Sequence, residues 1–144
     1  GVKVSNIIIS NPEYREKYME VTNFLNTFAY KTCEIVYTEC REWFEALMDV
    51  LHENKKLVED FIAEHLPMIK VYPLEGTYLM WLDCRALGLS NEELENLMLK
   101  NDLYLDEGYL FGEEGSGFER WNIACPKQEL LAGLERFKAA IETL

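Results

Sequence analysis

The chain has 144 residues, of which 49% are hydrophobic and 12% aromatic, values that favour one globular domain over a disordered chain. Its 26 acidic residues against 14 basic ones give a formal net charge of −12 at pH 7. This balance argues against nucleic acid and anionic membranes as partners, because both select basic surfaces. It does not exclude a small anionic ligand, since one arginine can bind such a ligand inside an acidic protein.

The sequence predicts neither a membrane span nor a secretory signal. No apolar run approaches the roughly 20 residues that cross a bilayer, and the start GVKVSNIIIS lacks a basic segment followed by a long apolar one. The four cysteines form no C-x-x-C pair and the two histidines form no H-E-x-x-H motif. We therefore expect no metal site, reduced thiols and a cytoplasmic location.

The N-terminal half is predicted to be one strand followed by helices. Lys3–Ser10 carries three consecutive isoleucines, which favour a buried strand. Asn11 and Pro12 predict the N-cap and the first position of a helix that runs to about Phe28. A second helix is expected to continue into a long one that ends before Pro67.

The order predicted from Ile69 onward is strand, strand, helix, strand, strand, helix. Ser90 and Glu93 form a capping box at the start of the first of these helices. The strands are expected at residues 69–72, 77–83, 102–105 and 120–125. This order predicts a two-layer α+β fold, with a small, mostly antiparallel sheet, helices packed on one of its faces, and long helices before it.

A glycine-rich loop precedes the last strand, with Gly108, Gly112, Gly115 and Gly117 within ten positions. The strand carries Arg120, whose planar and permanently charged guanidinium can bind a carboxylate through two parallel hydrogen bonds. The alternative is a surface arginine paired with Glu113, Glu114 or Glu119, in an ion pair worth about 0–1 kcal/mol. Residue chemistry alone favours this surface pair.

Four segments taken together resemble a known family. They are IVYTECREW (35–43), YPLEGTYLMWLD (72–83), SNEEL (90–94) and FGEEGSGFERWNIACP (111–126). In this order they resemble the C-terminal part of fold-type-I pyridoxal-phosphate enzymes of the class I/II aminotransferase superfamily, most of all the cystathionine β-lyase (C–S lyase) subgroup. The resemblance implies that residues 1–34 are a remnant of the large domain with the interdomain helix, and residues 35–144 the aminotransferase-like small domain.

The resemblance also implies a substrate site. In this family the arginine of an F-x-R-x-N motif binds the α-carboxylate of the amino-acid substrate, and the match favours that role for Arg120 over the surface pair. Asn122 belongs to the same motif, and Gly76 and Gly112 match positions near the substrate. Lys127 stands where many relatives have arginine, which keeps a cation but not a bidentate geometry.

The family's Schiff-base lysine motif, of the type S-K-T-F-N-L-A-G, is absent, and Lys3 lies in no such motif. In relatives the large domain also supplies the remaining cofactor contacts. Pyridoxal 5'-phosphate is therefore expected in a full-length parent and not on this chain alone, to which no catalytic residue is assigned. The isolated chain is expected to be inactive.

The parent reaction implied by the resemblance is α,β-elimination of cystathionine or another L-cysteine conjugate to a thiol, pyruvate and ammonia, catalysed by a homodimer. Two alternatives stay open: an aminotransferase, and a non-catalytic ligand-binding or dimerisation module. The isoleucine strand has lost its expected neighbours, so it is expected to be disordered, to be repositioned, or to pair with another copy so that the chain self-associates through it.

Overall fold

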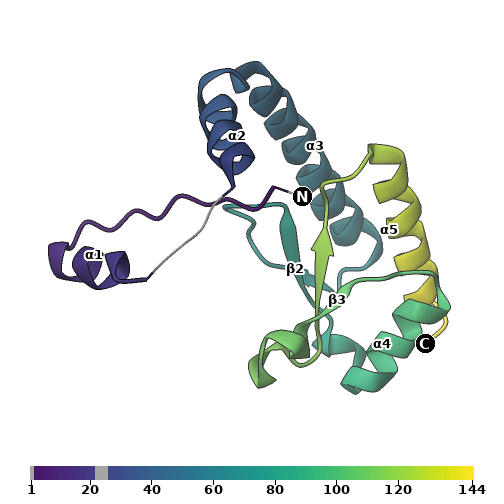
Figure 1. Cartoon of the computed structure of the whole chain (residues 1–144). Coiled ribbons are helices and arrows are strands. Elements are labelled where there is room, and N and C mark those ends of the chain that lie inside the picture. Colours follow the sequence, from purple (N-terminus) through teal and green to yellow (C-terminus); the bar gives the residue numbers. More distant parts are fainter. Residues whose placement is uncertain (1, 22–25) are drawn as a thin grey trace. The chain divides into compact units, whose positions relative to one another are not determined.

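The computed structural model describes residues 2–21 and 26–144 (Figure 1). Contacts within the chain divide it into two compact units, Gly1–Leu47 and Met48–Leu144. This division does not test the domain boundary predicted after residue 34, which stays a prediction. Within the part of the chain that is described, no helix is both long and apolar enough to cross a membrane.

The first unit holds α1 (Pro12–Met19), α2 (Thr27–Thr38) and the beginning of α3 (Arg41–His65). The N-cap of α1 is the one predicted. The side-chain oxygen of Asn11 accepts hydrogen bonds from the backbone N–H groups of Glu13 (2.9 Å) and Tyr14 (3.4 Å). Pro12 occupies the first helical position, where no backbone donor is needed.

The strand predicted at residues 3–10 is wrong. These residues form no regular secondary structure, and the side chain of Ile8 is 90% exposed. The carbonyl oxygen of Ile9 accepts from Arg15 Nη2 (2.8 Å) instead of from a neighbouring strand. A strand needs a partner for its backbone groups, and a run of isoleucines does not supply that partner.

The N-terminal helices are also shorter than predicted. α1 ends at Met19 rather than near Phe28, and residues 22–25 lie outside the described residues. The second helix was predicted to continue into the long one, but the structure has two separate helices: α2 ends at Thr38 and α3 begins at Arg41. The Thr38 hydroxyl donates to the carbonyl of Glu34 (2.8 Å), a contact that commonly bends a helix.

The second unit contains the rest of α3, one sheet, two further helices and three short 3-10 turns. Its elements are β1 (Lys70–Val71), β2 (Leu79–Asp83), η1 (Arg85–Leu87), α4 (Asn91–Lys100), β3 (Asp106–Glu107), η2 (Gly108–Phe111), η3 (Glu113–Gly115), β4 (Phe118–Asn122) and α5 (Lys127–Ile141). The four strands form one antiparallel sheet in the order β1-β2-β4-β3. The predicted α+β fold is confirmed.

Local signals set most boundaries in this unit. The backbone N–H of Glu93 donates to Ser90 Oγ (3.3 Å), and the backbone N–H of Ser90 donates to Glu93 Oε2 (2.8 Å), which confirms the capping box. The strand predicted at residues 102–105 lies later, at β3, because Asp102 adopts a positive φ of 54° in the turn that ends α4. β4 begins two residues earlier than predicted.

The sheet buries one face against helices. Met80 and Leu82 of β2 and Trp121 of β4 pack in one core with residues of α3 and α5, among them Val58, Ile62, Leu134 and Phe137. Figure 1 shows α5 running beside the sheet. Because successive residues of a strand point to opposite faces, Arg120 lies on the other face of the sheet from Trp121.

Candidate functional site

The site is built around Arg120, on the sheet face opposite the helix-packed core. Arg120 pairs with Trp81 of β2 on one side and with Asp106 of β3 on the other. Its Nε and Nη2 atoms both donate to Asp106 Oδ2, at 3.1 and 2.8 Å. Its guanidinium carbon lies 4.2 Å from the centroid of the Phe111 ring. With 28% of its side chain exposed, Arg120 is held in place while still accessible to solvent.

The ion-pair partner of Arg120 differs from the expected acids. Glu113, Glu114 and Glu119 were the candidates, and the structure places Asp106 in that position instead. The antiparallel register sets Asp106 directly opposite Arg120, whereas Glu119 precedes Arg120 on the same strand and points to the other face. This ion pair leaves the predicted substrate role of Arg120 untested.

A second arginine lies on the same sheet face. Arg85 donates through Nε and Nη2 to the two carboxylate oxygens of Asp83, at 2.9 and 2.7 Å, and its guanidinium covers the ring of Phe118 (4.6 Å). The hydrogen bond from Arg85 lowers the pKa of Asp83 below its usual value. The ring of Phe118 in turn stacks on Trp81, with centroids 5.6 Å apart. Two arginines therefore cover neighbouring aromatic rings, each held by an aspartate.

The remaining predicted site residues take separate positions. Asn122 is the next outward-facing residue of β4 after Arg120, and its Oδ1 accepts from the backbone N–H of Ala124 (2.9 Å). Gly112 has a φ of 134° and directly follows Phe111. Gly76 lies in the turn before β2, where an added Cβ would meet nothing within 4 Å. The structure thus aligns Arg120 and Asn122 on one face and leaves the glycines in flanking turns.

The glycine loop folds back on itself. Gly108 and Gly115 approach so closely that a Cβ added to Gly115 would overlap the carbonyl oxygen of Gly108. This contact joins η2 to η3, and η2 carries the Phe111 ring that Arg120 covers. The loop thereby positions Phe111 against Arg120.

Sequence reasoning missed Asp106, Arg85 and Phe111 as members of this group. Asp83 and Arg85 are two residues apart, and such a D-x-R spacing could have indicated their ion pair. No local signal identifies Asp106, because its contact with Arg120 depends on how two strands separated by the glycine loop are aligned.

The residues around Arg120 do not by themselves fit pyridoxal phosphate. That cofactor requires a lysine beside its ring in addition to groups that orient it. The contacts that the structure gives Arg120 are with Asp106 and Phe111, neither of which is a lysine. Across residues 2–21 and 26–144, no three His, Cys, Asp or Glu side chains are placed to hold a metal ion.

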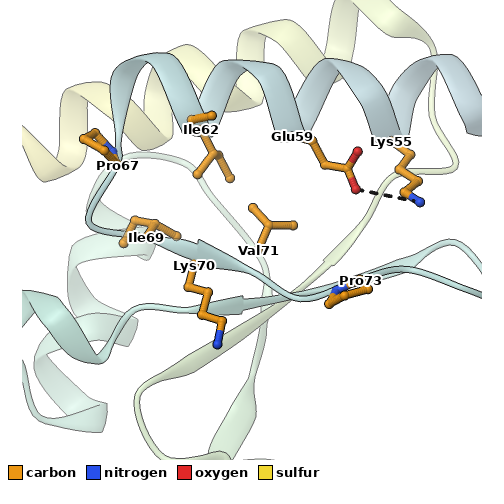
Figure 2. A pocket seen from close by; sticks show the side chains of 9 residues that line it. Lys55, Glu59, Ile62, Pro67, Ile69, Lys70, Val71 and Pro73 are labelled. Atoms are coloured by element: carbon orange, nitrogen blue, oxygen red, sulfur yellow. Dashed lines mark ion pairs between the residues drawn. The ribbon is translucent and has the colours of Figure 1, made fainter.

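A pocket of about 620 Å³ lies elsewhere, between α3 and β1 (Figure 2). Ile62, Ile69 and Val71 contribute apolar surface to it, and Lys55 contacts Glu59 across 3.8 Å at one end. β1 and β3 are the opposite edges of the sheet, so the pocket and the Asp106–Arg120 pair lie at different edges. None of the predicted substrate residues lines it.

Comparison with known proteins shows what the chain resembles, although no family model matches it. It is 35% identical to cystathionine β-lyase PatB of Bacillus subtilis over 98% of this chain and 38% of PatB. Cystalysin from Treponema denticola, whose crystal structure contains pyridoxal 5'-phosphate, superposes with a TM-score of 0.84 at 40% identity, over 94% of this chain and 36% of cystalysin. A pyridoxal-phosphate-bound putative aminotransferase from Clostridium difficile gives 0.78 at 36% identity, over 90% and 33%. The chain therefore spans about two-fifths of the length of PatB.

Proposed function

Because this chain belongs to the fold-type-I pyridoxal-phosphate enzymes and is related to their C–S β-lyases, we propose that it forms the small domain of such a lyase. In this proposal Arg120 binds the α-carboxylate of the amino-acid substrate. The reaction is the elimination of a thiol from cystathionine or another L-cysteine conjugate, with pyruvate and ammonia as the other products. The lysine and the cofactor contacts are assigned to a large domain outside these 144 residues.

The observation that carries the proposal is the placement of Arg120. Its guanidinium already binds one carboxylate, that of Asp106, through two nitrogens on a partly exposed sheet face. A free carboxylate that approaches this face would meet the same donors. An arginine fixed by a strand and by an aromatic ring fixes the orientation of its ligand as well, which is a positioning contribution to catalysis.

Asn122 and the flanking glycines extend the proposed site. Asn122 follows Arg120 on the same sheet face and offers a side-chain amide beside it. Gly76 and Gly112, in the turns at either side, are proposed to let the substrate approach the backbone. A homodimeric, cytoplasmic parent and self-association of the isolated chain through residues 3–10 belong to the same proposal.

Asp106 competes with the proposed ligand for Arg120. We expect the Asp106→Asn substitution to raise the affinity of the chain for formate by up to about fivefold, because exposed ion pairs contribute about 0–1 kcal/mol. Formate is the probe, with formamide as its uncharged counterpart. The measurement is the change in the Arg120 Nε–H resonance during a titration at constant ionic strength.

Asp83→Asn is the matched control for this titration. It removes one carboxylate from the same sheet face, but that carboxylate pairs with Arg85 and not with Arg120. Arg120→Lys in the Asp106→Asn background lacks the Nε–H group, so this comparison follows the backbone amide resonances of residues 106, 111 and 120 in both variants. The gain should disappear, since an ammonium cannot form the planar two-nitrogen contact. Equal formate affinity in the Asp106→Asn and Asp83→Asn variants would show that charge alone governs binding.

The isolated chain is expected to be catalytically inactive. Incubation with pyridoxal phosphate, borohydride reduction and intact-mass analysis should trap no single lysine stoichiometrically. Pyruvate release from cystathionine should not exceed the free-cofactor control, because these 144 residues contain no lysine motif of the type S-K-T-F-N-L-A-G. One stoichiometrically modified lysine, located by peptide mapping, would overturn the assignment of the cofactor to another domain.

Transamination is the second candidate function, because the chain matches a putative aminotransferase at 36% identity over 90% of its length. A carboxylate-binding arginine serves both reactions. An enzyme that contains this chain separates them: a lyase releases pyruvate and a thiol, whereas an aminotransferase transfers the amino group to a second keto acid. A non-catalytic module would show neither reaction.

A further inference from the structure

The edge strand β3 is joined to the sheet by two residue pairs of opposite character. Asp106 lies opposite Arg120, and Glu107 lies opposite Glu119. Because successive strand residues point to opposite faces, the first pair is an ion pair on the outer face. The second pair places two acids side by side on the helix-covered face. Like charges directly opposite each other destabilise a sheet.

Glu119 is the buried member of the acid pair. Only 1% of its surface is exposed, and neither carboxylate oxygen has a hydrogen-bond partner. An ionised carboxylate in such a place is costly unless it is paired. The neutral acid is much less costly, and its hydroxyl can donate to a neighbouring carboxylate.

Within the described part of the chain, the charged groups that act on Glu119 are all acids. Burial and the carboxylates of Glu107, Glu95 and Asp106 raise the pKa of Glu119 to about 8. The hydroxyl of Tyr109 in η2 donates its hydrogen bond to Glu95 Oε2 (2.9 Å) and not to the Glu119 carboxylate.

The thiol of Cys84 also faces this cluster. Burial and the Glu119 carboxylate raise the pKa of Cys84, so the thiol keeps its proton. Acids and neutral groups from β3, α4, η2 and the residue after β2 thus surround the Glu119 carboxyl.

We propose that the protonation state of Glu119 controls the pairing of β3 with β4, and through it the contact between Asp106 and Arg120. While Glu119 holds its proton, the strand pair is intact and Asp106 occupies Arg120. When the proton passes to water, the new carboxylate faces Glu107 without a counter-charge, and the strand pair separates. Asp106 moves away with β3, and Arg120 is left free to bind another anion.

β3 is the strand that separates, because it has the fewest pairs with the rest of the sheet around Glu119. It has two residues and lies at an edge, whereas β4 pairs with β2 over five residues, from Leu79↔Asn122 to Asp83↔Phe118. Strands at sheet edges open locally at less cost than central ones. The release of Asp106 depends on Glu119 and not on which ligand Arg120 binds. It can therefore be measured without any ligand.

The test is a pH titration of the whole chain by NMR. The side-chain carboxyl of Glu119 is followed by carbon-13 shift between about pH 6 and pH 10, and amide exchange at residues 106–108 is followed in parallel. After correction for the intrinsic exchange rate, protection at these amides should fall about tenfold or more through the Glu119 midpoint. Protection in the β2–β4 pair should stay unchanged.

Three substitutions make the test decisive. Glu119→Gln should keep the protection of residues 106–108 at high pH, while Glu114→Gln, an equal charge change in the exposed loop, should behave like the unchanged chain. Glu107→Gln, which retains Glu119, should move the Glu119 midpoint to lower pH. The proposal is overturned if Glu119 shows no midpoint in this range, or if β3 protection falls equally in Glu119→Gln. It is also overturned if β3 stays protected after Glu119 has titrated.

Discussion

Gly115→Ala is expected to lower the free energy of unfolding of the chain by about 3 kcal/mol, the upper range for overpacking a tightly packed site. The added Cβ would overlap the carbonyl oxygen and carbonyl carbon of Gly108, which are backbone atoms and cannot rotate away. Relief requires η2 and η3 to separate, which would also remove Phe111 from Arg120. Urea unfolding followed by tryptophan fluorescence measures the change in stability.

Gly76→Ala is the matched control for that substitution. Nothing lies within 4 Å of the Cβ that it would add, and its backbone is not in the left-handed region. The same chemical change there should alter stability by less than about 0.5 kcal/mol. Similar losses in the two variants would mean that the Gly108–Gly115 contact is unimportant and that glycine-to-alanine changes destabilise this chain generally.

Asn54→Ala is the second substitution with a large expected effect, also about 3 kcal/mol. Asn54 lies in α3 and is 1% exposed. Its Nδ2 donates to the carbonyl oxygens of Ile123 (2.8 Å) and Cys125 (2.9 Å), just beyond the end of β4. Without the amide, two acceptors lose their donor, and each buried unsatisfied group costs about 1–3 kcal/mol.

The control for this amide is Asn101→Ala. Asn101 also donates one Nδ2 hydrogen bond to a carbonyl oxygen, that of Leu97 (2.9 Å), but within its own helix end and at a partly exposed position. Its loss should cost less than about 1 kcal/mol, because water can replace the donor. If Asn54→Ala and Asn101→Ala lowered the free energy of unfolding by the same amount, this would contradict the role of Asn54 in joining α3 to the end of β4.

Features that depend on neighbouring residues could be predicted from the sequence. The capping box of Ser90 and Glu93, the N-cap at Asn11 and the order of elements after Ile69 each follow from residues a few positions apart. The prediction that Arg120 lies on a strand after a glycine loop is confirmed for the same reason.

Features that depend on distant pairing could not be predicted. The isoleucines at positions 7–9 suggested a strand, but a strand forms only if another part of the chain pairs with it. The partner of Arg120 is Asp106 rather than a nearer glutamate, because the register of β3 with β4 decides which side chains meet. The burial of Glu119 was not predictable either, because the sequence does not say which face of β4 is covered by helices. Once that face is known, the alternation of side chains along β4 places Glu119 on it.

The first strand of the sheet has a consequence for how copies of this chain meet in concentrated solution. β1 has two residues, carries the charge of Lys70, and stands between Pro67 and Pro73, which lack a backbone N–H (Figure 2). An incoming strand would find few backbone donors there, and charge and proline are the features that discourage strand addition. Amyloid-like growth of this chain would therefore not propagate from that edge.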